Sequence, residues 1–142
     1  MSIDKFEGPN RFLSNFWPCE VRYDGWAYPS VEHAYQAAKF TDPEKRAKIQ
    51  AATTAQAAKK IGRTKGIRAD WDDVKFGIMR DLLQQKFEQG SANATQLLAT
   101  GDEQLVEGNW WGDTYWGVCK GKGKNHLGNL LMQRRSFLLL LQ

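Results

Sequence analysis

A carboxylic acid, an amide and an amine lie at helical spacing in one short segment of the sequence. Glu32, Gln36 and Lys39 follow Pro29 and Ser30, and a helix turning by about 100° per residue places the three within an arc of roughly 60°. Ser30 is a favourable N-cap, so Glu32 lies in the first turn, where the helix dipole favours its ionised form. A carboxylate and an amine on one rigid face are suited to acid–base or covalent chemistry. The alternative is a solvated face of a surface helix.

The apolar residues of the same segment place this polar face beside the core. Val31, Ala34 and Ala38 form an adjoining apolar stripe, and Tyr35 lies between the two faces. His33 points about 100° away from the carboxylate, so the two neighbours in sequence do not form a catalytic dyad.

A second group of reactive residues lies in the segment 109–117, which contains three of the six tryptophans. Trp110, Trp111 and Trp116 alternate there with glycine and polar residues. In such a loop indole faces can stack on a base while Asp113 supplies a charge. The alternative is that the tryptophans close the end of a small core and Asp113 caps a turn.

Two short segments combine glycine with positive charge. Segment 121–128 leads into the last helix, where glycines leave backbone N–H groups accessible and a helix N-terminus attracts anions. Segment 59–63 also joins cations to a glycine. Both suit a phosphate, although neither has Walker A or Rossmann spacing. The alternatives are a solvated basic turn and a solvated helix end.

Composition limits the kind of protein that these residues serve. The chain has 142 residues with 42% hydrophobic and 25% charged residues, a mean hydropathy of −0.59 and a net charge of +4. One globular domain over residues 1–142 is expected, in the cytoplasm and without a membrane span or a secretory leader. Cys19 and Cys119 have no CxxC spacing, so we expect reduced thiols and no structural metal. The basic C-terminal third favours phosphates or nucleic acid.

The elements that must position these residues are a hairpin and a series of helices. Asp24-Gly25 suits a type I′ turn between strands 19–23 and 26–28. The reactive helix follows directly and stops at Thr41. Five further helices are expected, at 43–51, from Thr53 or Thr54 to 61, at 72–89, at 92–99 and at 125–141. One further strand is expected at 104–107. The pattern predicts an α+β fold, mostly helical around a small hairpin or sheet.

Motifs spread along nearly the whole chain occur together in the order of a known family. They are 12–16, Asp24-Gly25, 29–40, 59–63, Trp71 with Val74-Lys75, Lys86-Phe87, 97–100, 105–107, 113–117 and 121–128. In this order they resemble the YbiA-like, or NADAR, family.

The resemblance implies an N-glycosidase acting on N-ribosyl substrates. Members are associated with hydrolysis of ribosylamino intermediates of the early riboflavin pathway and with removal of ADP-ribose from guanine in nucleic acid. Glu32 matches the catalytic glutamate of the family, Trp71 its functional tryptophan and Asp113 the acidic residue of its late aromatic loop. The Trp110-Trp111 pair and the ending 115–119 depart from the family pattern, which leaves the lining of the base pocket open.

Glycosidic chemistry gives each of these residues a role. Breaking a ribosyl C–N bond builds positive charge on the sugar, which Glu32 would stabilise or meet with activated water while Asp113 assists the departing nitrogen. A second route passes through a transient Schiff base on Lys39. The residues expected to bind substrate are Asn15, Phe16, Tyr35, Gln36, Arg63, Trp110, Tyr115, Trp116, Gly121, Lys122, Gly123, Lys124 and Asn125.

The partner expected from this chemistry is a substrate containing ADP-ribose or another phosphorylated N-riboside, including ADP-ribosylated DNA or RNA. No cofactor and no metal are expected. The alternative from a different class is a non-catalytic module that binds ADP-ribose or nucleic acid. The sequence makes no prediction of oligomeric state.

Overall fold

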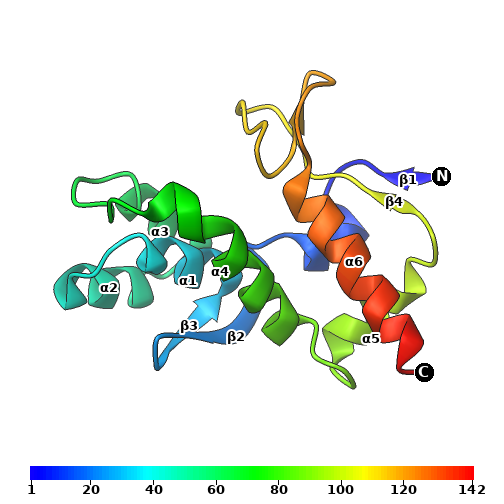
Figure 1. Cartoon of the computed structure of the whole chain (residues 1–142), viewed down its shortest axis with the longest axis horizontal. Helices are drawn as coiled ribbons and strands as arrows, with labels where there is room; N and C mark the ends of the chain where they lie inside the picture. The colour runs from blue at the N-terminus through cyan, green and yellow to red at the C-terminus, as the bar shows by residue number, and fades with distance from the viewer. The chain divides into compact units, whose positions relative to one another are not determined.

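Six α-helices, one 3-10 helix and three pairs of short strands make up the computed structural model, which describes all of residues 1–142 (Figure 1). The expected α+β class is confirmed. The residues divide into two compact units, one formed by Asn15–Lys86 and the other by Met1–Ser14 together with Phe87–Gln142. One domain over residues 1–142 stays a prediction.

The unit Asn15–Lys86 begins with an antiparallel hairpin. Its strands are β2 (Pro18–Tyr23) and β3 (Trp26–Ser30). Asp24 and Gly25 connect them with φ angles of 52° and 81°. A type I′ turn requires a positive φ at both central residues, so the expected hairpin is confirmed.

Four helices complete this unit. They are α1 (Val31–Ala38), α2 (Pro43–Gln50), α3 (Ala55–Ile61) and α4 (Trp71–Lys86). Helix α1 packs against the other three and against both strands, and Figure 1 shows it among them. Every residue of α1 is buried. A polar side chain on this helix is therefore inside the unit and needs polar partners.

The helix starts follow the local rules of capping. The Ser30 hydroxyl accepts from the His33 N–H at 3.1 Å and the Thr54 hydroxyl from the Ala57 N–H at 3.0 Å. Asp42 caps α2 by accepting from Glu44 N–H at 3.0 Å. Capping side chains satisfy N–H groups that the helix cannot pair itself.

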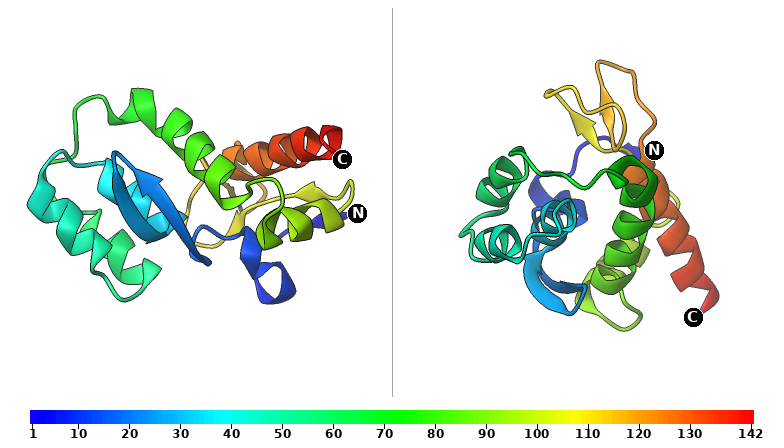
Figure 2. Two further views of the ribbon diagram at one scale, coloured as in Figure 1. Left: turned by 90° about the horizontal axis from the view of Figure 1, so that it is seen from below. Right: turned by 60° about the vertical axis from the view of Figure 1, so that its left-hand side comes forward.

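The other unit combines two helices with pairs of very short strands. Its elements are β1 (Ser2–Ile3), the 3-10 helix η1 (Gly8–Leu13), α5 (Ala92–Ala99), β4 (Gln104–Leu105), β5 (Gly108–Asn109), β6 (Val118–Cys119) and α6 (His126–Leu140). Strand β1 pairs in parallel with β4, and β5 with β6. Helix α6 packs on α5 and β4, as the two views of Figure 2 show.

Several observed boundaries differ from the expected ones by one to three residues. Helix α4 ends at Lys86 instead of residue 89, and the chain then turns to Gly90, whose φ is 86°. The strand expected at 104–107 is limited to Gln104–Leu105. Pairing with the two residues of β1 sets that length.

Cys19 and Cys119 are free thiols, and no three His, Cys, Asp or Glu side chains gather as metal ligands. None of the helices combines the length and the apolar character that crossing a bilayer requires.

Candidate active site

The carboxylate of Glu32 is buried in the unit Asn15–Lys86. The side chain is 7% exposed and lies in the first turn of α1. Its Oε2 accepts a hydrogen bond of 2.6 Å from Nε2 of Gln36, and its backbone N–H donates to the Asn15 carbonyl at 3.0 Å. The amide donor and the N-terminal end of the helix both favour a negative charge here. The alternative of a solvated helix face is wrong for Glu32.

Lys39 follows the same helix as its C-cap and is partly exposed. Its Nζ lies 3.5 Å from the Gly62 carbonyl oxygen and 5.9 Å from the centre of the Tyr35 ring. Burial lowers the pKa of Lys39, and the carboxylate of Glu32 opposes this effect. The positive charges that lower the pKa further belong to Arg63, Lys59 and Lys75. The amine is therefore neutral more often than that of an ordinary lysine.

Aromatic side chains lie along the same unit. The rings of Tyr35 and Trp71 are 5.0 Å apart at 57°, and both side chains are buried. The Phe16 ring lies 5.9 Å from Nζ of Lys59. Asn15 is buried, and its Oδ1 makes no hydrogen bond. The unit thus brings Asn15, Phe16, Glu32, Tyr35, Gln36, Lys39, Arg63 and Trp71 together on α1 and the elements around it.

His33 supports the start of α1 and takes no part in a dyad with Glu32. Its Nδ1 lies 2.6 Å from the Ser30 hydroxyl, and its Nε2 lies 3.0 Å from the Ala52 carbonyl oxygen. A carbonyl can only accept, so Nε2 carries the proton and Nδ1 accepts from Ser30, an assignment made from these partners. Both nitrogens are used, as expected for a structural histidine.

Asp113 belongs to the other unit and caps a turn of the aromatic loop. Its Oδ1 accepts from the backbone N–H groups of Tyr115 at 3.1 Å and Trp116 at 2.9 Å. The Asn109 side chain holds the same loop by bonding both the N–H and the carbonyl of Asp113. The capping alternative is therefore correct for Oδ1. A role of Asp113 in proton transfer stays a prediction, and it would use Oδ2.

Trp110 does not close a core. It is 84% exposed, and its ring meets that of Trp111 edge-on at 5.6 Å. Tyr115 packs edge-on against Trp116 at 4.8 Å and against His126 at 4.6 Å. The loop therefore contains a largely exposed indole, that of Trp110, in addition to a packed aromatic cluster.

The N–H groups at the start of α6 are not available to an anion. Those of Asn125, His126 and Leu127 donate to the carbonyls of residues 117, 115 and 116 at 3.3, 3.2 and 3.0 Å. The Asn125 amide bonds Leu105 O and Glu107 N–H, both at 2.9 Å. The expectation that the helix start and Asn125 present free groups is wrong, because the preceding loop folds back onto them.

The glycines of this loop have a steric reason instead. A Cβ at Gly123 would overlap the Gly117 carbonyl oxygen, and the φ angles of Gly121 and Gly123 are 76° and 147°. Lys122 and Lys124 are exposed. Binding of phosphate at this loop stays a prediction that depends on the two lysines.

Comparison with known proteins identifies the family of this chain. The sequence model of the NADAR domain family matches residues 3–139 of this chain. This chain belongs to the NADAR family.

Relatives and a solved structure extend the comparison. The chain is 41% identical over 131 residues to the N-glycosidase YbiA of Escherichia coli (strain K12), which covers 90% of this chain and 81% of that protein. It is 41% identical over 127 residues to a riboflavin biosynthesis protein of Vibrio vulnificus (strain YJ016), covering 87% of this chain but only 34% of that protein. The NMR structure of E. coli YbiA matches 99% of this chain and 85% of its own with a TM-score of 0.84 at 37% identity.

Two residues that act on Gln36 and Lys39 in this NADAR chain were not among the expected site residues. Gly62 faces Gln36, and the charge of Lys75 acts on Lys39. Lys75 lies four residues after Trp71 on α4, and this spacing places both on one helix face. That spacing was the available signal for Lys75, whereas no local pattern indicates the role of Gly62.

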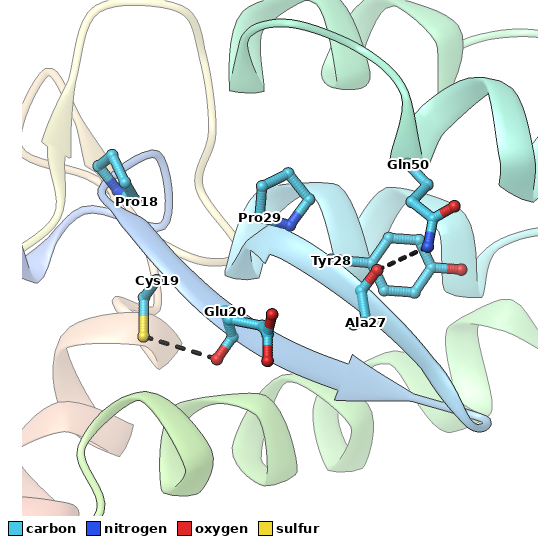
Figure 3. A pocket seen from close by; sticks show the side chains of 7 residues that line it. All are labelled: Pro18, Cys19, Glu20, Ala27, Tyr28, Pro29 and Gln50. Atoms are coloured by element: carbon cyan, nitrogen blue, oxygen red, sulfur yellow. Dashed lines mark hydrogen bonds between the residues drawn. The ribbon is translucent and has the colours of Figure 1, made fainter.

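The hairpin of the NADAR chain also carries an open hollow of about 590 Å³. Figure 3 shows its lining residues, Pro18, Cys19, Glu20, Ala27, Tyr28, Pro29 and Gln50. Gln50 Nε2 donates to the Ala27 carbonyl at 2.8 Å and so occupies part of the strand edge. Burial raises the pKa of Tyr28, whose hydroxyl makes no hydrogen bond. None of the expected site residues lines this hollow, so it is not the candidate active site.

Proposed function

We propose that this NADAR chain is an N-glycosidase that hydrolyses the N-glycosidic bond of a phosphorylated N-riboside, with ADP-ribosylated guanine in nucleic acid or a nucleotide as its substrate. The buried Glu32 carboxylate, hydrogen-bonded by Gln36 at 2.6 Å, carries the proposal. The names of the relatives support the reaction class.

In direct hydrolysis, Glu32 acts on the sugar. Positive charge develops at the anomeric carbon as the C–N bond breaks, and a buried carboxylate stabilises this charge strongly because little water screens it. The same carboxylate can take a proton from the attacking water. Asp113 is the proposed acid for the departing nitrogen, through Oδ2.

A second route uses the amine of Lys39. The neutral amine attacks the anomeric carbon, the base leaves with a proton, and the ring-opened ribose is held as a Schiff base that water hydrolyses to free amine and sugar. The lowered pKa of Lys39 supports this route, because only the neutral amine is nucleophilic.

Binding of the rest of the substrate uses aromatic and cationic residues. The exposed face of Trp110 suits stacking on a base, and Tyr115 and Trp116 are proposed beside it in that role. Arg63, Lys122 and Lys124 are exposed and positively charged, and are proposed to bind phosphate or pyrophosphate.

A second candidate function is hydrolysis of ribosylamino-pyrimidine intermediates of riboflavin biosynthesis. The Vibrio vulnificus relative, whose name refers to that pathway, favours it. Both candidates share the bond that breaks, and they differ in the base and in the length of the phosphate-bearing group.

Mass spectrometry of an ADP-ribosylated guanine oligonucleotide incubated with the protein tests the proposal. We expect the oligonucleotide to lose the mass of ADP-ribose and free ADP-ribose to appear. Turnover restricted to a ribosylamino-pyrimidine would favour the second candidate. Binding of the oligonucleotide with no product released from it or from a ribosylamino-pyrimidine would contradict both candidates and indicate a non-catalytic module.

A further inference from the structure

We infer that Gln36 is a positioning residue that fixes the Glu32 carboxylate, and that Gly62 is glycine because Gln36 needs the space beside it. The inference rests on the proposed function insofar as Glu32 is the reacting carboxylate. It gives Gln36 a different role from the substrate contact expected from the sequence.

The Gln36 amide is buried and hydrogen-bonded through its nitrogen alone. Nε2 donates to Glu32 Oε2 at 2.6 Å, and the side chain is only 3% exposed. Oε1 is buried and makes no hydrogen bond. The amide cannot turn around, because its oxygen would then face the carboxylate. A buried acceptor without a partner costs stability, so its retention calls for an explanation.

Gly62 is not required by its backbone conformation. It is the C-cap of α3 with φ −64° and ψ −11°, a right-handed helical conformation open to any residue. Alanine at such a position ordinarily stabilises a protein by restricting the unfolded chain. The reason for glycine must therefore lie in its surroundings.

The Gln36 side chain fills the space into which a side chain at position 62 would point. A Cβ at position 62 would overlap Gln36 Oε1, and would lie 2.7 Å from its Cδ and 3.2 Å from its Cβ. These are the three nearest atoms to that Cβ. The bare Cα of Gly62 thus forms the wall against which the Gln36 amide rests.

The two contacts together restrain the carboxylate. Glu32 and Gln36 are four residues apart on one helix face, and α3 packs against α1. The Gln36 amide is bounded by the Glu32 carboxylate at its nitrogen and by Gly62 at its oxygen. An orientation fixed before substrate binds reduces the entropy lost on reaching the transition state. Gln36 should therefore affect turnover more than binding.

Two variants and a matched control test the inference on the ADP-ribosylated guanine oligonucleotide. Gln36→Met keeps the length of the side chain and removes the hydrogen-bond donor. Gly62→Ala adds a Cβ that would displace the Gln36 amide. Gly77→Ala is the control, because the nearest atom to a Cβ there is Arg80 Nη2 at an ordinary 3.7 Å. We expect Gln36→Met and Gly62→Ala each to lower kcat by roughly tenfold or more with KM within about twofold, and Gly77→Ala to change neither.

The coupling between positions 36 and 62 is the sharpest readout. In a Gln36→Ala background the amide is gone, so adding Gly62→Ala should lower kcat by less than about twofold. Independent, multiplicative losses would overturn the role given to Gly62. A rise in KM with unchanged kcat for Gln36→Met would overturn the positioning role, since it would show a substrate contact.

Crystal structures of Gln36→Met and Gly62→Ala keep the inference separate from the proposed function. We expect the Glu32 carboxylate to be displaced in both variants. A carboxylate in its original place in both would overturn the inference, whatever the activity. Full turnover by Glu32→Gln would instead contradict the proposed function alone, because the displacement can be measured without catalysis.

Discussion

Single residues around Glu32 explain why a charged group is tolerated inside the unit. Ser30 starts the helix, the Asn15 carbonyl accepts the Glu32 N–H, and Gln36 donates to the carboxylate. Each contact satisfies a polar group that burial would otherwise leave unpaired. The environment is thus built for an ionised side chain at the head of a short helix.

Lys39 gives a prediction that separates the two chemical routes. If the Schiff base forms, borohydride added during turnover should attach the ribosyl fragment to the protein, with the added mass on the peptide containing Lys39. Lys39→Ala should then lose both the adduct and most of the turnover. Full activity of Lys39→Ala, with no adduct in the wild type, would show that direct hydrolysis is the route.

Parts of the site follow from the sequence at this scale. The helical spacing of Glu32, Gln36 and Lys39 and the cap at Ser30 are local features, and local rules predict them. The contact between Gln36 and Gly62 joins two helices, and nothing near Gly62 in sequence indicates it. The acceptor role of Asp113 Oδ1 was one of two open alternatives, because the residue type fits both.

At the scale of elements, α1 is the part that positions the reactive groups. It is buried on every side and packs against β2, β3, α2, α3 and α4. The hydrogen bonds of its N-cap, Ser30, are therefore buried, whereas those of the N-caps of α2, α3 and α5 are more exposed. This difference leads to a prediction about stability.

Ser30→Ala should destabilise the protein more than Ser91→Ala. Ser91 caps α5 through one bond to Ala94 N–H at 3.1 Å, and its loss should cost about 1 kcal/mol. Ser30 also bonds buried His33 Nδ1 at 2.6 Å, so its loss leaves a second buried group unpaired and should cost about 2–3 kcal/mol. Urea denaturation of both variants measures the difference. Equal losses would contradict the role given to the Ser30–His33 pair.

The elements predicted correctly are those with strong local signals. The Asp24-Gly25 turn, the start of α2 at Pro43, the start of α3 after Thr54, which was one of two expected positions, and the range of α5 agree with the structure. The pieces that were missed are β1, η1, β5 and β6. A two-residue strand shows no alternation, and its existence depends on a partner far away in the chain.

For the molecule as a whole, Lys86 is the residue that should couple stability to pH. It is 1% exposed, and burial lowers its pKa to about 7 from 10.5, while Cys19 opposes the effect. Above pH 7 the unfolded chain therefore binds more protons than the folded one, and stability rises with pH until the unfolded lysine also titrates. Below pH 7 the folded protein carries the full cost of burying the charged lysine.

Comparison with Lys86→Met isolates the contribution of Lys86 to the pH dependence of stability. Between pH 6 and pH 9 the free energy of unfolding of the wild type should rise by roughly 2–3 kcal/mol relative to the variant. Urea denaturation of both proteins across this range measures it, and the other titrating groups cancel in the difference. Parallel pH profiles would show that Lys86 remains charged in the folded protein.

The central claim is that the buried carboxylate of Glu32 performs the glycosidic cleavage. Glu32→Gln tests it most directly, because the amide oxygen can still accept from Gln36 and the fold should be kept. Single-turnover mass spectrometry on the ADP-ribosylated guanine oligonucleotide, with binding measured in parallel, should show a loss of cleavage of roughly a hundredfold or more with nearly unchanged affinity. Cleavage at the wild-type rate by a folded Glu32→Gln protein would contradict the account.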